Sequence, residues 1–385
     1  MKIQLYNKIS NKGLILFNGA YEIGENVENP DGILVRSAKL HDIPLDGNLK
    51  AIARAGAGVN NVPVDKCSEK GIVVFNTPGA NANAVKELVL AGMLLSARPT
   101  FKAMQWLETV KDDDNLEQLA EKEKSRFKGC ELAGKTIGVI GLGAIGIKVA
   151  NMALHLGMEV YGCDPYLSVQ SAWQLSRNVK LVNSNDEIFA RSDYISLHVP
   201  MTPNTKNMID ANALNKMKDG VTILNYARGG LVDEDAMLEA MNNGKVKNYV
   251  SDFASPKMMQ HDNYICTPHL GASTPEAEEN CAVMAVNQMR DYLENGNITN
   301  SVNLPNISME RSGAIRITCF HKNEPNMLAQ ISQTISAAGL NIENMINKSK
   351  KEYAYTIVDV DQANVDDVVN KLNTIPAILK VNVYL

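Results

Sequence analysis

Short apolar runs rich in β-branched residues alternate with helical apolar patterns along most of the chain. In the first part, the runs at 32–35, 51–55 and 73–75 predict strands, and the apolar run 84–97 predicts a helix. Further strands are predicted at 136–140, 160–164, 194–197, 221–224, 249–253 and 264–266. Strands that alternate with helices in this way predict an α/β architecture with parallel sheets.

The pattern changes toward the C-terminal part of the chain. Residues 276–294 predict a long helix whose first turn carries acidic residues, which suit the positive end of the helix dipole. Residues 295–312 predict a linker, and residues 314–385 follow a β-α-β-β-α-β pattern, which predicts a separate small domain. The charged stretch 111–124 is interpreted as a solvated helix or loop.

Composition narrows the class of protein. The chain has 385 residues with 45% hydrophobic residues, and its formal net charge of −5 argues against a nucleic-acid-binding footprint. No apolar run approaches the ~18 residues that a membrane span needs, and residues 1–12 do not resemble a signal peptide. The six cysteines are scattered, which favours free thiols over disulfides or a metal site. A cytoplasmic location, with no metal, membrane or nucleic-acid partner, is therefore expected.

The strongest motif lies at the start of the second group of strands. Gly141, Gly143 and Gly146 form a G-x-G-x-x-G turn between a strand and a helix, and the next strand ends in Asp164. This arrangement is the dinucleotide fingerprint, in which the glycines admit the pyrophosphate to the helix N-terminus and the acid binds the adenosine ribose. The alternative is a glycine-rich turn that binds no ligand. Because a carboxylate at Asp164 would repel a 2′-phosphate, NAD is predicted rather than NADP.

Two residues that follow other strands suit hydride chemistry. A histidine can move a hydroxyl proton near neutral pH, and the planar fork of an arginine can hold a carboxylate. His269 and Arg228 each follow a predicted strand of the nucleotide-binding sheet. Taken singly, His269 is better interpreted as a structural histidine and Arg228 as a surface ion-pair arginine, but their common position at strand ends of one sheet favours the functional interpretation.

Together these motifs resemble those of the D-2-hydroxyacid dehydrogenase family. The resemblance is carried by the stretches 141–146, 164–165, 198–200, 225–230 and 268–272. It implies a Rossmann nucleotide-binding domain inserted into a flavodoxin-like α/β substrate domain. The implied boundaries are 1–97 with 276–304 for the substrate domain and 98–275 for the nucleotide domain.

The resemblance also implies roles for site residues. His269 would be the general acid/base and Arg228 the substrate anchor. The residues implied to lie near NAD are Gly141, Gly143, Ala144, Ile145, Gly146, Asp164, His198, Val199, Pro200, Ala227, Arg228, Asp252, His269, Gly271 and Ala272. In this family a glutamate after the Asp-Val-Phe motif pairs with the catalytic histidine, whereas residues 252–257 here read Asp-Phe-Ala-Ser-Pro-Lys.

A phosphorylated substrate would need further cations. The segments around Arg36-Ser37, Arg54-Ala55-Gly56 and Asn81 resemble the family's substrate-side motifs. They imply NAD-dependent oxidation of D-3-phosphoglycerate to 3-phosphohydroxypyruvate, the first step of serine biosynthesis. Two alternatives stay open, namely a dehydrogenase for another D-2-hydroxy acid and an NAD-sensing binding protein on the same fold.

The C-terminal segment 313–385 resembles the ACT regulatory domains that bind serine. The resemblance implies His321, Asn323 and Asn341 as contacts for an L-serine effector in a homo-oligomer, either a dimer or a tetramer. The alternative is a dimerisation module without a ligand.

Overall fold

Two stretches that are far apart in the sequence, Met1–Ala80 and Pro275–Leu385, form one unit of the structure, and Asn81–Thr274 forms a second. The computed structural model describes residues 1–45, 47–362 and 365–385. The first unit contains a five-stranded sheet and a C-terminal four-stranded sheet, and the second contains a seven-stranded sheet. The predicted α/β class with parallel sheets is therefore confirmed for the five-stranded and the seven-stranded sheets.

The five-stranded sheet of the first unit is parallel throughout, in the order β2-β1-β3-β4-β5. That order is the flavodoxin-like one. Its strands are β1 (Lys2–Tyr6), β2 (Glu22–Gly24), β3 (Gly32–Val35), β4 (Ala51–Arg54) and β5 (Val73–Phe75). The three strands predicted here are confirmed, with β4 ending at Arg54 rather than at 55.

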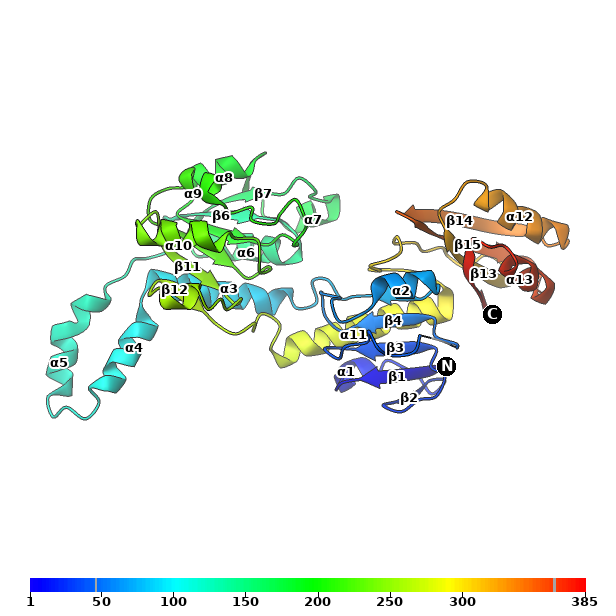
Figure 1. Ribbon diagram of the computed structural model, residues 1–385, viewed down its shortest axis with the longest axis horizontal. Coiled ribbons are helices and arrows are strands. Elements are labelled where there is room, and N and C mark those ends of the chain that lie inside the picture. Colours follow the sequence, from blue (N-terminus) through cyan, green and yellow to red (C-terminus); the bar gives the residue numbers. More distant parts are fainter. Residues whose placement is uncertain (46, 363–364) are drawn as a thin grey trace. The chain divides into compact units, whose positions relative to one another are not determined.

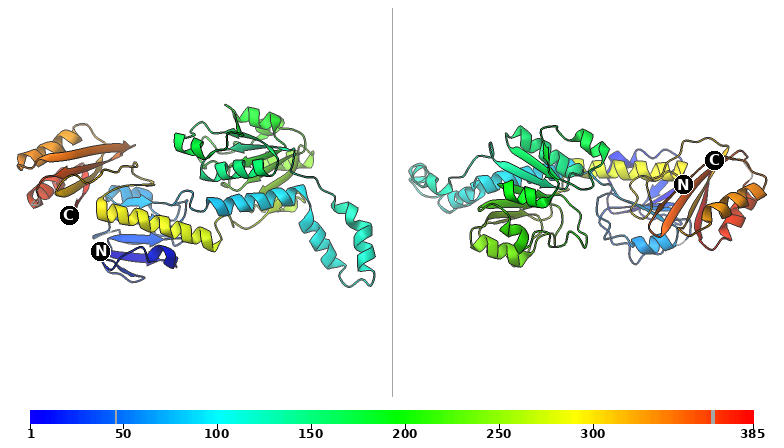
Figure 2. Two further views of the ribbon diagram at one scale, coloured as in Figure 1. Left: turned by 180° about the vertical axis from the view of Figure 1, so that it is seen from behind. Right: turned by 90° about the horizontal axis from the view of Figure 1, so that it is seen from above.

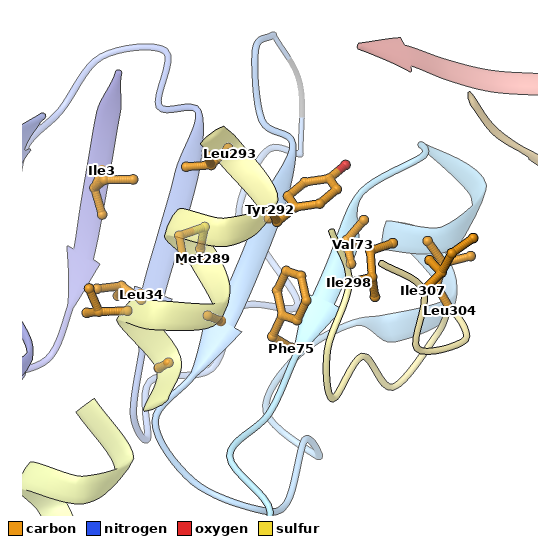
Figure 3. Close-up of a cluster of buried hydrophobic side chains, with 14 of the residues drawn as sticks. Ile3, Leu34, Val73, Phe75, Met289, Tyr292, Leu293, Ile298, Leu304 and Ile307 are labelled. Carbon is orange, nitrogen blue, oxygen red and sulfur yellow. The ribbon is translucent and has the colours of Figure 1, made fainter. Parts of the chain in front are cut away.

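Helix α11 (Pro275–Asn295) covers one face of this sheet, with the short α1 (Asn11–Leu14) against it, whereas α2 (Val64–Glu69) packs on the other face. The apolar side of α11 packs on alternate residues of the strands, because successive strand residues point to opposite faces. Figure 3 shows Met289, Tyr292 and Leu293 of α11 beside Ile3, Leu34 and Phe75 of the strands. The helix predicted at 276–294 is confirmed.

The second unit has a parallel seven-stranded sheet in the order β12-β11-β10-β9-β6-β7-β8. The chain reverses its direction of strand addition between β6 and β9, and ligands of such sheets bind at that switch point. The strands are β6 (Thr136–Ile140), β7 (Glu159–Cys163), β8 (Lys180–Leu181), β9 (Tyr194–Leu197), β10 (Val221–Asn225), β11 (Val246–Ser251) and β12 (Tyr264–Cys266).

Helices lie on both faces of this sheet (Figure 2). The helices of the second unit are α3 (Ala82–Ala97), α4 (Thr100–Thr109), α5 (Leu116–Glu123), α6 (Ala144–His155), α7 (Val169–Gln174), α8 (Asn185–Arg191), α9 (Ala211–Asn215) and α10 (Glu234–Asn242), with short 3₁₀ turns η1 (Lys124–Phe127) and η2 (Met258–Gln260).

Helix α3 corrects one predicted boundary. The sequence placed residues up to 97 in the substrate domain, but α3 belongs to the second unit. Val85, Val89 and Met93 of α3 pack in the same core as Ile137 and Ala150. The unit boundary therefore falls before the helix, between Ala80 and Asn81, because the apolar face of α3 has its partners on β6 and α6.

Helices α4 and α5 run side by side away from the sheet of the second unit (Figures 1 and 2). Neither helix has a buried residue, and the predicted solvated character of 111–124 is confirmed for α5. Helix α4 nevertheless exposes large apolar side chains, with Phe101 59% and Met104 67% exposed.

The C-terminal segment forms an antiparallel sheet in the order β14-β15-β13-β16, with α12 and α13 on one face (Figure 1). Its elements are β13 (Ile315–Lys322), α12 (Met327–Ala337), β14 (Ile342–Lys350), β15 (Tyr353–Val360), α13 (Asp366–Asn373) and β16 (Ile378–Tyr384). The predicted β-α-β-β-α-β order is confirmed.

This C-terminal lobe is not separated by a free linker, contrary to the prediction for 295–312. Ile298, Leu304 and Ile307 are buried in the core that includes α11, and Tyr355 of β15 joins the same core. Tyr355 Oη donates to the carbonyl of Gly296 at 3.1 Å. The lobe is therefore packed directly against the end of α11.

Candidate active site

The fingerprint loop between β6 and α6 has the shape that its glycines predict. Gly141 has φ +92°, and a Cβ there would lie 2.6 Å from the carbonyl oxygen of His198. A Cβ on Gly146 would lie 1.9 Å from the carbonyl oxygen of Gly141, whereas one on Gly143 would meet nothing within 4 Å. Backbone atoms therefore leave no space for a side chain at Gly141 or Gly146. At Gly143, next to the first N–H groups of α6, the space is open.

Asp164, directly after β7, is held against this loop. Its Oδ2 accepts from the backbone N–H of Leu142 at 2.8 Å, and its Oδ1 accepts from that of Tyr166 at 2.8 Å. Each carboxylate oxygen has a further lone pair. The carboxylate is therefore fixed at the loop and can still accept hydrogen bonds from a ligand hydroxyl.

His198 follows β9, beside Gly141, and precedes Val199 and Pro200. Its Nε2 lies 2.8 Å from Ser196 Oγ, and burial lowers the pKa of His198 to about 3. The ring is therefore neutral at pH 7 and acts as a hydrogen-bonding group rather than as a charge.

Arg228 lies in a loop after β10 that is shaped by Asn225. The buried Asn225 amide donates from Nδ2 to the carbonyl of Arg228 at 3.0 Å, and its Oδ1 accepts from the N–H of Ala227 at 3.2 Å. Arg228 Nη1 donates to the carbonyl of Ala227 at 2.7 Å. The sequence indicated the loop as a motif but did not identify Asn225 as the residue that holds it.

Asp252 follows β11, the strand between those that lead to Arg228 and His269. It is 2% exposed, and neither carboxylate oxygen accepts a hydrogen bond of ordinary geometry from the described residues. Burial raises the pKa of the Asp252 carboxyl, and the nearby His269, the N–H of Gly271 and Arg228 oppose this rise. Asp252 is thus a buried acceptor without an adequate donor.

His269 follows β12 and is exposed. Its ring meets that of Phe253 edge-on, with 4.9 Å between centroids, and a Cβ on Gly229 would lie 3.7 Å from the same phenyl ring. Phe253 therefore packs between the loop of Arg228 and the loop of His269. Gly271 and Ala272 continue the second loop, and Gly271 lies against Asp252 Oδ2.

The segment that lacks the family's glutamate is tied to α10 instead. Ser255 Oγ donates to Glu234 Oε2 at 2.8 Å, and Lys257 forms an ion pair with Asp235. Across the parts of the chain that the structure describes, no carboxylate lies within ion-pair distance of His269. Lys257 is therefore directed toward α10.

Four of the five predicted substrate residues lie together in the first unit. Arg36 and Ser37 follow β3, and the Ser37 N–H donates to Asn7 Oδ1 at 2.9 Å. Arg54 Nε donates to the carbonyl of Arg36 at 3.0 Å, and a Cβ on Gly56 would lie 2.8 Å from Arg54 Nη1. Asn81 lies elsewhere, at the start of α3 in the second unit.

The three predicted effector residues are not brought together within one chain. His321 is buried, with Nδ1 2.8 Å from the carbonyl of Lys322 and Nε2 2.9 Å from Thr356 Oγ1. Its partner across β15 is Ala354, whereas the start of β14, next to Asn341, pairs with Val360. Six strand residues correspond to about 20 Å, so Asn341 lies at the opposite end of the sheet from His321 and Asn323.

In the described residues, no helix is both long and apolar enough to cross a bilayer. No group of three or more His, Cys, Asp or Glu side chains in residues 1–45, 47–362 and 365–385 is placed to hold a metal ion.

Comparisons with known proteins show which proteins this chain is similar to. Residues 90–271 match the family model described as the NAD binding domain of D-isomer specific 2-hydroxyacid dehydrogenases. A hydroxypyruvate reductase from Thermotoga maritima is 40% identical over 70% of this chain and 86% of its own length. A D-3-phosphoglycerate dehydrogenase from Methanocaldococcus jannaschii is 39% identical over 77% of this chain, which spans only 56% of that relative. The crystal structure of cofactor (NAD⁺)-bound 3-phosphoglycerate dehydrogenase from Entamoeba histolytica has a TM-score of 0.61 at 27% identity, covering 79% of this chain and 98% of that one.

Proposed function

The chain belongs to the D-isomer specific 2-hydroxyacid dehydrogenase family, and on that basis we propose that it oxidises D-3-phosphoglycerate to 3-phosphohydroxypyruvate with NAD. The observation that carries the proposal is the placement of Arg228 and His269 on either side of the buried Asp252, at the carboxyl ends of β10, β12 and β11. The Arg228 guanidinium can bind a carboxylate, and the His269 imidazole can transfer a proton. Both at one edge of a nucleotide-binding sheet suit hydride transfer at a hydroxy acid.

The residues present fit NAD. The open position beside Gly143 leaves room for the pyrophosphate at the N-terminus of α6. Asp164 would accept from the adenosine ribose, and the unsatisfied Asp252 carboxylate would accept from the carboxamide N–H. When bound, NAD supplies the hydride acceptor for the oxidation.

The chain's own residues supply binding and proton transfer. Arg228 would hold the substrate carboxylate, and His269 would take the hydroxyl proton during oxidation and return it during reduction. Asn225 would keep the Arg228 loop in place, and Phe253 would limit rotation of the His269 ring, through the contacts described above. Arg36, Ser37, Arg54, Gly56 and Asn81 would contact the remainder of the substrate.

A second candidate is reduction of an unphosphorylated acid, since the Thermotoga maritima relative named above is a hydroxypyruvate reductase. A single assay separates the two candidates, namely kcat/KM for 3-phosphohydroxypyruvate against hydroxypyruvate with NADH. We expect a clear preference for the phosphorylated acid, and an equal or reversed preference would favour the second candidate. No turnover of either acid would favour an NAD-sensing binding protein.

Removing the carboxylate of Asp164 tests the cofactor. We expect wild-type protein to prefer NADH over NADPH, because a 2′-phosphate would meet a carboxylate already fixed at the fingerprint loop. In Asp164→Ala the ratio of the KM for NADPH to the KM for NADH should fall by about tenfold or more, because the variant lacks the carboxylate that repels the 2′-phosphate. Steady-state KM values for both cofactors measure it, and equal KM values in the wild type would contradict the assignment.

Truncating the two arginines of the first unit tests the phosphate site. A charge-assisted phosphate contact contributes roughly 1.5–3 kcal/mol, so Arg36→Ala and Arg54→Ala should each raise KM for 3-phosphohydroxypyruvate about tenfold or more. KM for hydroxypyruvate should change much less. If both substrates weakened equally, the arginines would support the fold instead, a role for which Arg54 already has contacts to backbone carbonyls.

The C-terminal lobe is proposed to be an ACT domain that binds L-serine. The β-α-β-β-α-β order and the position of Asn323 at the surface support this proposal. Because His321 and Asn341 lie at opposite ends of the sheet, serine would need residues from two copies of the chain. Calorimetry that detects no serine binding at millimolar concentration would rule the proposal out.

A homo-oligomer is also proposed, with α4 and α5 as the contact surface. Phe101 and Met104 lie one turn apart on α4 and are 59% and 67% exposed, and a second copy of the chain is the commonest partner for such a surface. Sedimentation that finds only monomers at micromolar concentration would contradict this proposal.

A further inference from the structure

Arg36 is already bound to a carboxylate where it would meet the substrate phosphate. Its Nη2 donates to Glu278 Oε1 at 2.6 Å, in the first turn of α11. The main-chain carbonyl of Arg36 accepts from Arg54 Nε, which fixes the backbone beneath the side chain. Any phosphate that binds Arg36 must therefore either displace Glu278 or lie next to it.

We propose that Glu278 determines specificity, because its carboxylate pairs with Arg36 in the absence of substrate and opposes the binding of phosphorylated hydroxy acids. This inference rests on the proposed function. Glu278 should lower the affinity for substrates with a phosphate and leave the affinity for unphosphorylated acids unchanged. Binding of a dianion is then an exchange of one anion for another on Arg36.

The charges involved are grouped closely. The charges of Arg36, Arg54 and Glu278 all act on the buried thiol of Cys281, which lies one turn further along α11. Burial raises the pKa of the Cys281 thiol, Arg54 and Arg36 oppose that rise, and Glu278 adds to it. A phosphate dianion placed on these arginines would therefore lie within the field of the Glu278 carboxylate, and like charges at such separations repel.

The pair is also weak enough to exchange. Both side chains are 41% exposed, and ion pairs in contact with water contribute little to stability. A phosphate carries more charge than a carboxylate and fits the guanidinium fork with two parallel hydrogen bonds. A bound phosphate should therefore displace Glu278 without disturbing α11, whose packing depends on residues further along the helix.

The next residue provides a matched control. Glu279 lies in the same turn of α11 but pairs with Lys12 of α1 at 2.5 Å. Glu279→Gln removes the same charge from the same turn and leaves the pair between Arg36 and Glu278 intact. In contrast, Glu278→Gln keeps an amide oxygen that can accept from Arg36, so it isolates the effect of charge from that of orientation.

The kinetic test compares these two variants in the full-length protein. Glu278→Gln should lower KM for 3-phosphohydroxypyruvate about tenfold, equivalent to 1.4 kcal/mol, with kcat and the KM for hydroxypyruvate unchanged. Glu279→Gln should change none of these values. If Glu278→Gln raised KM for the phosphorylated acid, or left it unchanged, the proposal would be overturned.

A binding test needs no turnover. Calorimetric titration with inorganic phosphate should give a Kd about tenfold lower for Glu278→Gln than for wild type, and the difference should vanish when Arg36→Ala is present in both backgrounds. Equal phosphate affinities in wild type and Glu278→Gln would contradict the proposed role of Glu278 but not the proposed function. If neither protein bound phosphate and the enzyme turned over only unphosphorylated acids, both the role of Glu278 and the proposed function would be contradicted.

Discussion

Replacing His269 with alanine is expected to lower kcat/KM by about 10²–10⁴-fold in both directions of the reaction, the usual contribution of a positioned general acid/base. The proton of the substrate hydroxyl would leave as the hydride leaves, and neither His198 nor Lys257 is available to take it. His198 is neutral and directed to Ser196, and Lys257 is paired with Asp235. Initial rates of NADH formation and consumption measure the loss.

A second histidine provides the control for this variant. His261 precedes β12 on the same loop as η2, and its Nδ1 accepts from the N–H of Asn263 at 3.1 Å. His261→Ala should keep near wild-type rates, and both variants should bind NADH normally by fluorescence titration. A loss of less than tenfold in His269→Ala would mean that another group or water carries the proton.

The parts of the fold that were predicted correctly have local signals. The strand β6, the glycine turn and α6 follow one another within a short segment, so residue pattern alone was sufficient. The strand β1 was missed because Lys2 and Gln4 interrupt its apolar pattern. Gln4 is buried nonetheless, since its Oε1 accepts from the N–H of Val27 at 2.7 Å, a contact that only the folded chain provides.

The same reasoning explains the errors in β11 and in the linker. The strand begins at Val246 rather than at 249, because the polar Asn248 is buried and donates to the carbonyl of Ser96 on α3 at 3.3 Å. Residues 295–312 have the asparagines and proline of a linker, but Asn303 Oδ1 accepts from the N–H of Val74 at 2.9 Å. Both features depend on partners far away in the sequence.

In the candidate site, too, some residues have local sequence signals and others depend on contacts between distant segments. The roles of Gly141, Asp164, Arg228 and His269 are predictions, and residue type and spacing were sufficient to make them. Phe253 supports His269 across neighbouring strands, so its contribution depends on the order β12-β11-β10, which the sequence did not specify, whereas Asn225 holds its own loop through Ala227 and Arg228. His321 was predicted as an effector contact from the resemblance to ACT domains, and that role stays a prediction; the burial of its strand, β13, depends on the folded sheet and its helices.

Arg316 gives the largest expected change in stability. Its guanidinium forms two hydrogen bonds with Asp359, Nε to Oδ1 at 2.7 Å and Nη2 to Oδ2 at 2.9 Å, and both side chains are fully buried. Nη1 donates to the carbonyl of Asn295 at the end of α11 at 2.9 Å, so the pair joins the C-terminal lobe to that helix. Arg316→Met should lower the free energy of unfolding by about 3–5 kcal/mol, because it leaves Asp359 buried and unpaired.

Urea denaturation of matched variants measures this loss. Arg290→Met, which breaks the partly exposed pair with Glu294 on the same helix, should cost no more than about 1 kcal/mol. Adding Asp359→Leu to Arg316→Met should recover most of the stability, since an apolar pair of similar volume removes the unpaired charge. A double variant as unstable as Arg316→Met would show that shape or the contact to Asn295, rather than charge, dominates.

The pH dependence separates charge from packing at this pair. Burial raises the pKa of Asp359, but the hydrogen bonds from Arg316 and Ser312 outweigh it and hold the pKa below its usual value. The stabilisation by this carboxylate is therefore complete above the unfolded pKa of about 3.9 and is lost as pH falls through the lower folded value. In Arg316→Met the buried carboxyl loses its cation and can take up a proton in mild acid. The deficit relative to wild type should thus be largest at neutral pH and shrink toward pH 4, and a deficit independent of pH would assign the loss to packing.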